Sequence, residues 1–291
     1  MDMQELEIFV KTAEMLHFGR ASQASNLSPS ALTRTIQRLE EELGKPLFLR
    51  DNRSVALTEA GRQLLTYARS ATRDWQQFRE SIAAERDVLG TLSIYASITA
   101  VYGLLPDLLA AFRSAHPKVH LELRTGAAEH AIEQVLSGEI DLAVAALPDQ
   151  KQARLEFMPL VETPLVFIRP KSPTFAVPES DQPFDVASVP LVVPQSGPAR
   201  HRLNVWLRAH DITPNIALEV SGNEALIAMV RLGTGIGVTP QLALERSPFR
   251  DDVDVICGAP ELDPYVVGLC ANKRNLKRRT VDAMWNLARD L

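Results

Sequence analysis

Apolar positions in the first sixty residues recur with the period of amphipathic helices. They run at helical spacing from Leu6 to Leu16, with charged residues on the other faces, which predicts an opening helix. A shorter helix is expected from Arg20 to Ser25. Ser28-Pro29 then supplies an N-cap hydroxyl and a proline at the first helical position, and Gly44 is a residue typical of helix ends. A third helix is therefore predicted between Ser28 and Gly44.

The third helix has an apolar face and a polar face that carries hydroxyl, amide and guanidinium groups. After Gly44, two short apolar runs flank the polar turn 51–54, which predicts a two-stranded wing. Arginine pairs with guanine and glutamine with adenine in the major groove, so a helix, a turn and this helix predict a winged helix-turn-helix that reads double-stranded DNA. The residues expected at the DNA are Ser28, Ser30, Thr33, Arg34, Gln37 and Arg38 on the helix and Arg50 and Arg53 on the wing.

A long uninterrupted helix is predicted next. Thr58 is a good N-cap, and nothing breaks the helical pattern before Gly90. Apolar side chains recur along it at alternating spacings of 4 and 3, as in the seam of a coiled coil. This seam packs either on the protein's own body or on a second copy of the chain, and we expect the second copy. The seam residues expected in a dimer are Leu64, Ala68, Ala71, Trp75, Phe78 and Ile82.

From residue 91 onwards, predicted strands and helices alternate, which indicates an α/β architecture. The expected strands are 92–96, 119–124, 141–146, 165–169, 190–194, 216–220, 235–239 and 265–270. The expected helices are 102–114, 129–137, 199–209, 223–232 and 276–287. If the last strand and helix return to the first group of elements, the chain crosses twice between two lobes that flank a cleft.

Small polar residues follow several of these strands, where open α/β sheets bind ligands near helix N-termini. Each cluster alone is ordinary helix capping, but together they predict a site for a small anion. The expected effector-binding residues are Ser97, Ile98, Thr99, Thr125, Gly126, Gln195, Gly197 and Asn223. Arg124, Arg200 and Arg202 are the candidates for a clamp on the anion's carboxylate.

Composition narrows the class of protein. The formal net charge of −5 gives no general affinity for nucleic acid, so DNA binding rests on the local arrangement alone. The two cysteines, both expected to be buried, and an acidic start where a signal peptide would be basic predict a cytoplasmic location with no membrane partner. The six histidines are scattered, and no nucleophile or dinucleotide motif stands in its required context. We therefore expect no metal, no cofactor and no enzymatic activity.

The run from Phe18 to Gly61 resembles the DNA-binding domain of LysR-type transcriptional regulators. The matching residues include Ser28 to Arg34, Leu39-Glu40, Leu43-Gly44, Leu47-Phe48 and Leu57 to Gly61. The resemblance implies a multi-domain protein: a winged helix-turn-helix at 1–58, a linker and dimerisation helix at 59–89, and a two-lobed effector domain, similar to periplasmic binding proteins, at 90–291. Lobe 1 would comprise about 90–162 and 265–291, and lobe 2 about 163–264.

Within the family, His17 to Arg20, Ile36 to Glu41 and Arg50 to Arg53 resemble most closely an activator of isoleucine and valine biosynthesis. This implies acetolactate and acetohydroxybutyrate, the substrates of ketol-acid reductoisomerase, as inducers. It also implies a homodimer, or a tetramer of two dimers, that acts on promoter DNA and RNA polymerase. A LysR-type regulator of another small organic acid stays open. A cytoplasmic solute-binding protein would leave the first ninety residues unexplained, and an enzyme acting on the same keto acids would need a metal or cofactor site.

Overall fold

The computed structural model describes residues 1–50, 55–83, 88–148, 150–172, 175 and 185–290. They form two compact units. The first contains Met1–Gly90 and Ser137–Glu139, and the second contains Thr91–Leu136 and Ile140–Leu291. None of the described helices is long and apolar enough to cross a membrane.

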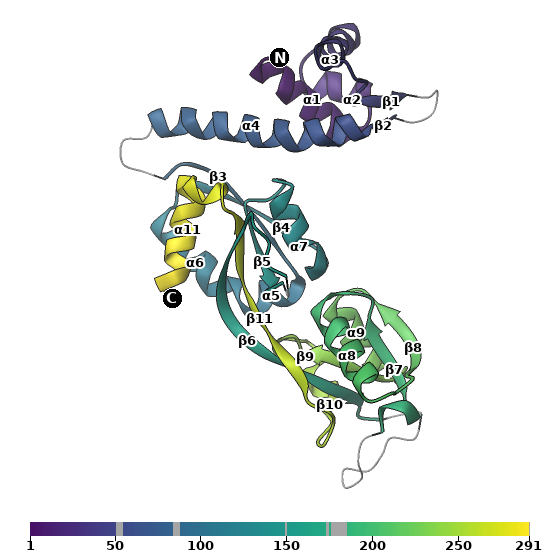
Figure 1. The fold of residues 1–291 in the computed structure, drawn as a ribbon. Helices are drawn as coiled ribbons and strands as arrows, with labels where there is room; N and C mark the ends of the chain where they lie inside the picture. Colours follow the sequence, from purple (N-terminus) through teal and green to yellow (C-terminus); the bar gives the residue numbers. More distant parts are fainter. Residues whose placement is uncertain (51–54, 84–87, 149, 173–174, 176–184, 291) are drawn as a thin grey trace. The chain divides into compact units, whose positions relative to one another are not determined.

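The first unit is a winged helix-turn-helix followed by a long helix (Figure 1). Its elements are α1 (Met3–Met15), α2 (Phe18–Ala24), α3 (Pro29–Leu43), β1 (Phe48–Arg50), β2 (Val55–Leu57) and α4 (Glu59–Ala83). The two short strands pair antiparallel, with Phe48 opposite Leu57. The core is formed by the apolar stripes of α1 and α3, the wing and the first turns of α4. The predicted order of elements is confirmed here.

Local side-chain caps explain where these helices begin and end. The Ser28 hydroxyl accepts a hydrogen bond from the Ala31 amide at 3.2 Å, and Pro29 follows in the first turn. Gly44 ends α3 with a φ of 64°, a left-handed conformation that glycine adopts without strain. The Thr58 hydroxyl accepts from the Gly61 amide at 2.9 Å, which caps α4. Residues 88 and 89 are not helical, so the prediction that this helix continues to 89 is wrong at its end.

The second unit is built on one mixed sheet with the strand order β4-β3-β5-β11-β6-β9-β7-β8, and β10 pairs with β6. One lobe contains β3 (Gly90–Ala96), α5 (Ile98–Gly103), α6 (Leu105–Ala115), β4 (Val119–Thr125), the 3₁₀ turn Ala128–His130, α7 (Ala131–Leu136), β5 (Leu142–Ala146) and α11 (Arg279–Asp290). The other contains β7 (Pro190–Pro194), α8 (Gly197–Ala209), β8 (Asn215–Val220), α9 (Asn223–Arg231), β9 (Ile236–Pro240), α10 (Gln241–Glu245) and β10 (Val253–Val255).

Two long strands join the lobes: β6 (Leu155–Pro170) and β11 (Leu262–Asn272) pair antiparallel and run from one lobe into the other (Figure 1). The expected double crossing is therefore present. Only 165–169 was predicted as strand within β6, but the observed strand also runs through Pro159 and Pro164, although proline is rare inside strands. Pro159 is accommodated at a shift in register, opposite Gly268. A Cβ atom at Gly268 would lie 2.0 Å from the Met158 carbonyl oxygen, so glycine is needed there.

Several predicted boundaries differ from the observed ones. The expected helix 102–114 is two helices, α5 and α6, which meet at Leu104 just before Pro106. The last helix begins at Arg279, after a 3₁₀ turn at Asn275–Lys277. Cys270 is buried as expected, but Cys257 is exposed because it lies in the turn after β10.

A buried ion pair holds elements of the first lobe together. The Asp141 carboxylate, just before β5, contacts the Arg278 guanidinium, just before α11, and the two residues are only 2% and 7% exposed. Asp141 also accepts a hydrogen bond from the Ser93 amide at 3.0 Å, and its own amide donates to the Ser93 hydroxyl at 3.0 Å. These contacts tie the last helix to β3 and β5 through charge-assisted hydrogen bonds.

Candidate functional site

The exposed face of α3 carries the residues that were expected to contact DNA. Leu32, Ile36 and Leu39 are fully buried on the opposite face. Among the predicted contacts on this helix and its cap, Ser28, Ser30, Arg34, Gln37 and Arg38 are exposed and Thr33 is partly exposed. A helix with its N-terminal half presented in this way matches the recognition helix of a helix-turn-helix protein.

Arg38 also has a structural partner that sequence reasoning missed. Its guanidinium forms an ion pair with Glu5 of α1, a residue that is only 4% exposed. Glu5 and Asp2 form a capping box, in which the Asp2 amide donates to Glu5 at 2.6 Å and the Glu5 amide donates to Asp2 at 2.8 Å. Arg38 therefore offsets the charge of a buried carboxylate, whereas Arg34 has no such ion pair in the described part of the chain.

The wing is tied to the same helix. Glu40 of α3 accepts hydrogen bonds from the Leu47 amide at 2.8 Å and the Phe48 amide at 3.3 Å. A Cβ atom at Gly61 would lie 2.2 Å from the Leu47 carbonyl oxygen, so glycine lets α4 approach the wing closely. Arg53 lies outside the described residues, and so does the side chain of Arg50.

The expected dimer seam on α4 divides into two parts. Leu64 and Ala68 are buried in the core of their own unit, and Ala71 packs against that core. The helix α1 packs against this part of α4 and covers Leu64 and Ala68 within the subunit. Further along, Trp75 and Phe78 are 42% and 54% exposed, and their rings stack with centroids 5.9 Å apart. The side chain of Ile82 lies outside the described residues.

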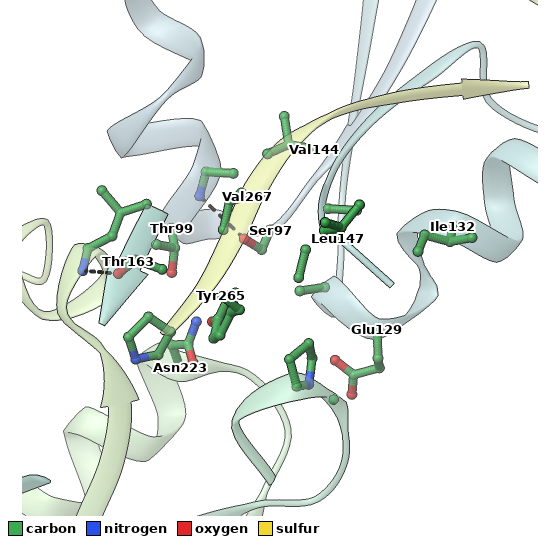
Figure 2. Close-up of a pocket in the computed structure, with 18 of the residues that line it drawn as sticks. Ser97, Thr99, Glu129, Ile132, Val144, Leu147, Thr163, Asn223, Tyr265 and Val267 are labelled. Carbon is green, nitrogen blue, oxygen red and sulfur yellow. Dashed lines mark hydrogen bonds between the residues drawn. The ribbon is translucent and has the colours of Figure 1, made fainter. Parts of the chain in front are cut away.

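In the second unit, a cavity of about 390 Å³ lies between the lobes (Figure 2). A smaller cavity of about 70 Å³ adjoins it and shares several of its lining residues. The beginnings of α5, α8 and α9 contribute to the lining, so backbone amides at helix N-termini gather around one space. Such a space is in the size range of small-ligand sites.

Six of the eight predicted effector residues line these cavities. Ser97, Gly197 and Asn223 line both, Thr99 lines the larger one, and Gly126 and Gln195 line the smaller one. Ile98 and Thr125 are exposed and line neither cavity. The reason is geometric: consecutive residues of a helix point about 100° apart, and consecutive residues of a strand point to opposite faces.

Two of the predicted polar groups already have partners. The Ser97 hydroxyl accepts from the Ala100 amide at 3.3 Å and caps α5. The Thr99 hydroxyl donates to the carboxylate of Glu224, in the first turn of α9, at 2.6 Å. A ligand that bonds to Thr99 therefore has to replace a contact within the protein.

The remaining lining residues were not predicted. Figure 2 shows an apolar side of the cavity formed by Ile132, Val144, Leu147 and Val267. Tyr265 of β11 lines both cavities, and burial raises the pKa of its phenol, so the hydroxyl stays a neutral donor. A pattern search for polar residues after strands could not find these positions, since most of them are apolar and Tyr265 lies within a strand.

None of the three candidate arginines for a carboxylate clamp lines either cavity. Arg200 donates to the Pro194 carbonyl at 3.0 Å and pairs with Glu219 at 2.9 Å, while Arg202 donates to the Pro264 carbonyl at 3.1 Å. Arg124 is exposed on β4. None of the described residues that line either cavity is an arginine or a lysine. The described residues also contain no group of three or more side chains of the types His, Cys, Asp and Glu that could hold a metal ion.

These features define a protein with a helix-turn-helix unit and a two-lobed α/β unit that encloses a ligand-sized cavity. The family model described as a bacterial regulatory helix-turn-helix protein of the lysR family matches residues 3–62, and the LysR substrate binding domain matches residues 85–291. The chain belongs to the LysR family of transcriptional regulators. Like its relatives, it is a regulator and not an enzyme.

Among curated relatives, the transcriptional activator IlvY of Salmonella typhimurium is 41% identical over 293 residues, which cover 99% of both chains. The transcriptional regulator IlvY of Escherichia coli is 40% identical over 292 residues, covering 99% of this chain and 98% of the relative. Among solved structures, a full-length OxyR variant of Pseudomonas aeruginosa matches with a TM-score of 0.69, 22% identity and coverage of 99% of this chain and 95% of that one. Full-length CbnR in complex with its target DNA matches with a TM-score of 0.66, 22% identity and coverage of 100% and 99%. These structures support the fold.

Proposed function

We propose that this protein is a transcriptional activator of branched-chain amino-acid biosynthesis that binds the promoter of the ketol-acid reductoisomerase gene. The observation that carries the proposal is the 41% identity to an IlvY activator along nearly the whole length of both chains. The exposed polar face of α3 supports major-groove contact, since Arg34 and Gln37 can pair with guanine and adenine. Such a regulator acts in the cytoplasm, where promoter DNA lies, and contacts RNA polymerase there.

The proposed inducers are acetolactate and acetohydroxybutyrate. In each, one carbon carries a carboxylate, a hydroxyl, an acetyl group and a methyl or ethyl group, so the molecule presents both polar oxygens and short alkyl groups. The cavity divides in the same way: helix N-termini and the hydroxyls of Thr99 and Tyr265 stand on its polar side, and Val144 and Leu147 on its apolar side. Without a lysine or arginine among the described lining residues, backbone amides, hydroxyl donors and the imidazole of His201 would hold the carboxylate.

The proposed active form is a homodimer, in which Trp75 and Phe78 of α4 are covered by a second copy, with dimers pairing further into tetramers. The exposed, stacked rings of Trp75 and Phe78 form a large apolar surface, which a helix surrounded by water seldom carries. An operator with two half-sites would match the two-fold symmetry of such a dimer.

The test has two parts. Fluorescence anisotropy measures binding to the promoter fragment and to a shuffled fragment of equal length at several salt concentrations, and we expect salt-sensitive binding that favours the promoter. Calorimetry then measures acetolactate, acetohydroxybutyrate and a panel of other small organic acids. Selective DNA binding without heat from either keto acid would support a LysR-type regulator of a different acid, whereas equal binding to both fragments would contradict the assigned promoter.

A further inference from the structure

Side-chain hydrogen bonds of Thr99 and Ser196 connect the lobes of the second unit at the cavity. The Thr99 hydroxyl in the first lobe donates to Glu224 in the second at 2.6 Å. The Ser196 hydroxyl in the second lobe donates to Glu129 in the first at 3.0 Å. The two pairs are reciprocal, because each lobe supplies one hydroxyl and one carboxylate.

The pair of Thr99 and Glu224 is the better protected of the two. Thr99 is 8% exposed and Glu224 is partly buried, whereas Ser196 and Glu129 are both exposed to water. A distance of 2.6 Å is typical of a charge-assisted hydrogen bond from a hydroxyl to a carboxylate. Water screens such a bond less where it is partly buried, so the contact between Thr99 and Glu224 is the main polar link.

Glu224 occupies a position suited to an anion. It lies in the first turn of α9, whose N-cap residue, Gly222, has no side chain to satisfy the amides there. The N-terminus of a helix favours negative charge. Glu224 lines the smaller cavity, and Thr99, to which it is bonded, lines the larger one.

We propose that Glu224 is a built-in competitor for the effector: in the free protein its carboxylate holds the Thr99 hydroxyl and links the lobes, and the effector's carboxylate takes over that hydroxyl on binding. The proposal rests on the proposed function in that the effector is an anion. Binding exchanges one charge-assisted hydrogen bond for another, so Thr99 by itself adds little net affinity. The exchange does change what connects the lobes: in the free protein Thr99 is bonded to a side chain of α9, and in the bound protein it is bonded to the ligand. The ligand therefore favours the bound arrangement of the lobes over the free one.

The test compares acetolactate binding by calorimetry in the full-length protein and four variants. Glu224→Gln keeps an oxygen acceptor near Thr99 but removes the charge, and we expect the Kd to fall about tenfold. Thr99→Val removes the exchanged hydrogen bond from both the free and the bound state, so its Kd should stay within about threefold of the wild type. In the double variant, the gain in affinity from Glu224→Gln should be smaller than in the wild-type background, because Thr99→Val has already removed the hydroxyl for which Glu224 and the effector compete. Glu261 is exposed and lines neither cavity, so Glu261→Gln controls for the loss of one negative charge.

Two results would overturn the proposal. Weaker binding by Glu224→Gln would make Glu224 a group that holds the ligand, and a tenfold loss in Thr99→Val with no effect of Glu224→Gln would make Thr99 an ordinary ligand contact.

If acetolactate binds to none of the proteins, the proposed effector is wrong, and hydrogen exchange of the ligand-free protein decides the link between the lobes. Amides of α5 and of the first turn of α9 should exchange faster in Thr99→Val and Glu224→Ala than in the wild type or Glu261→Gln. Equal exchange in all four would refute the link.

Discussion

Arg34 and Arg38 lie one helical turn apart on α3, yet the structure predicts different consequences for their removal. Arg34 is exposed, and its side chain forms no ion pair in the described part of the chain, so Arg34→Ala should leave the free energy of unfolding within about 0.5 kcal/mol of the wild type. If it pairs with a guanine, the same change costs about 1 to 3 kcal/mol of binding to the specific site and less on random DNA.

Arg38→Ala acts on the fold instead. It removes the partner of Glu5, which is 4% exposed and already tied to the Asp2 amide. Removing one partner of a fully buried pair costs about 3 to 5 kcal/mol. The side chain of Arg38 is 63% exposed, so water reaches one end of this pair, and we discount the loss to about 1 to 2 kcal/mol.

Urea unfolding of both variants and anisotropy titrations on specific and random DNA at one salt concentration separate these effects. A matched variant, Glu5→Gln, removes the buried charge and keeps an oxygen acceptor for the Asp2 amide, so it should lose less stability than Arg38→Ala while leaving the α3 surface intact. The reasoning fails if Arg34→Ala lowers the urea midpoint as much as Arg38→Ala. Equal loss of affinity on both DNA sequences would instead make Arg34 a phosphate contact.

Three further changes follow from other parts of the structure. Trp75→Glu with Phe78→Glu places charges on the exposed part of α4, so the oligomer should dissociate and DNA affinity should collapse; an unchanged sedimentation profile would show that this surface is not the interface. Arg278→Ala leaves the Asp141 carboxylate buried, and we expect about 3 to 5 kcal/mol of lost stability in chemical unfolding, against a minor change for the exposed Arg289→Ala. Tyr265→Phe removes a neutral donor from the cavity, so it should weaken effector binding about tenfold in calorimetry with no loss of stability. Unchanged effector binding would show that the phenol does not contact the ligand.

Local signals were sufficient for the helix-turn-helix. Ser28, Pro29 and Gly44 act through hydrogen bonds and backbone angles within a few residues, so the limits of α3 could be predicted from the sequence alone. The period of the apolar stripe likewise decided which face of α3 is buried. The length of β6 could not be predicted in this way, because Pro159 is tolerated only where Gly268 of a distant strand permits a bulge.

The chemistry of the cavity was decided by tertiary structure. Sequence reasoning placed Ser97, Thr99 and Asn223 near strand ends, and the structure brings them to one cavity. It could not reveal that Arg200 is paired with Glu219, or that Thr99 bonds to Glu224, a residue 125 positions away. An ion pair or hydrogen bond between distant residues leaves no periodic trace in the chain, since it depends on where the fold brings two side chains together. The sequence therefore determined the limits of α3 and the polar residues at the ends of several strands, and only the packing of the two lobes determined which charges face the cavity.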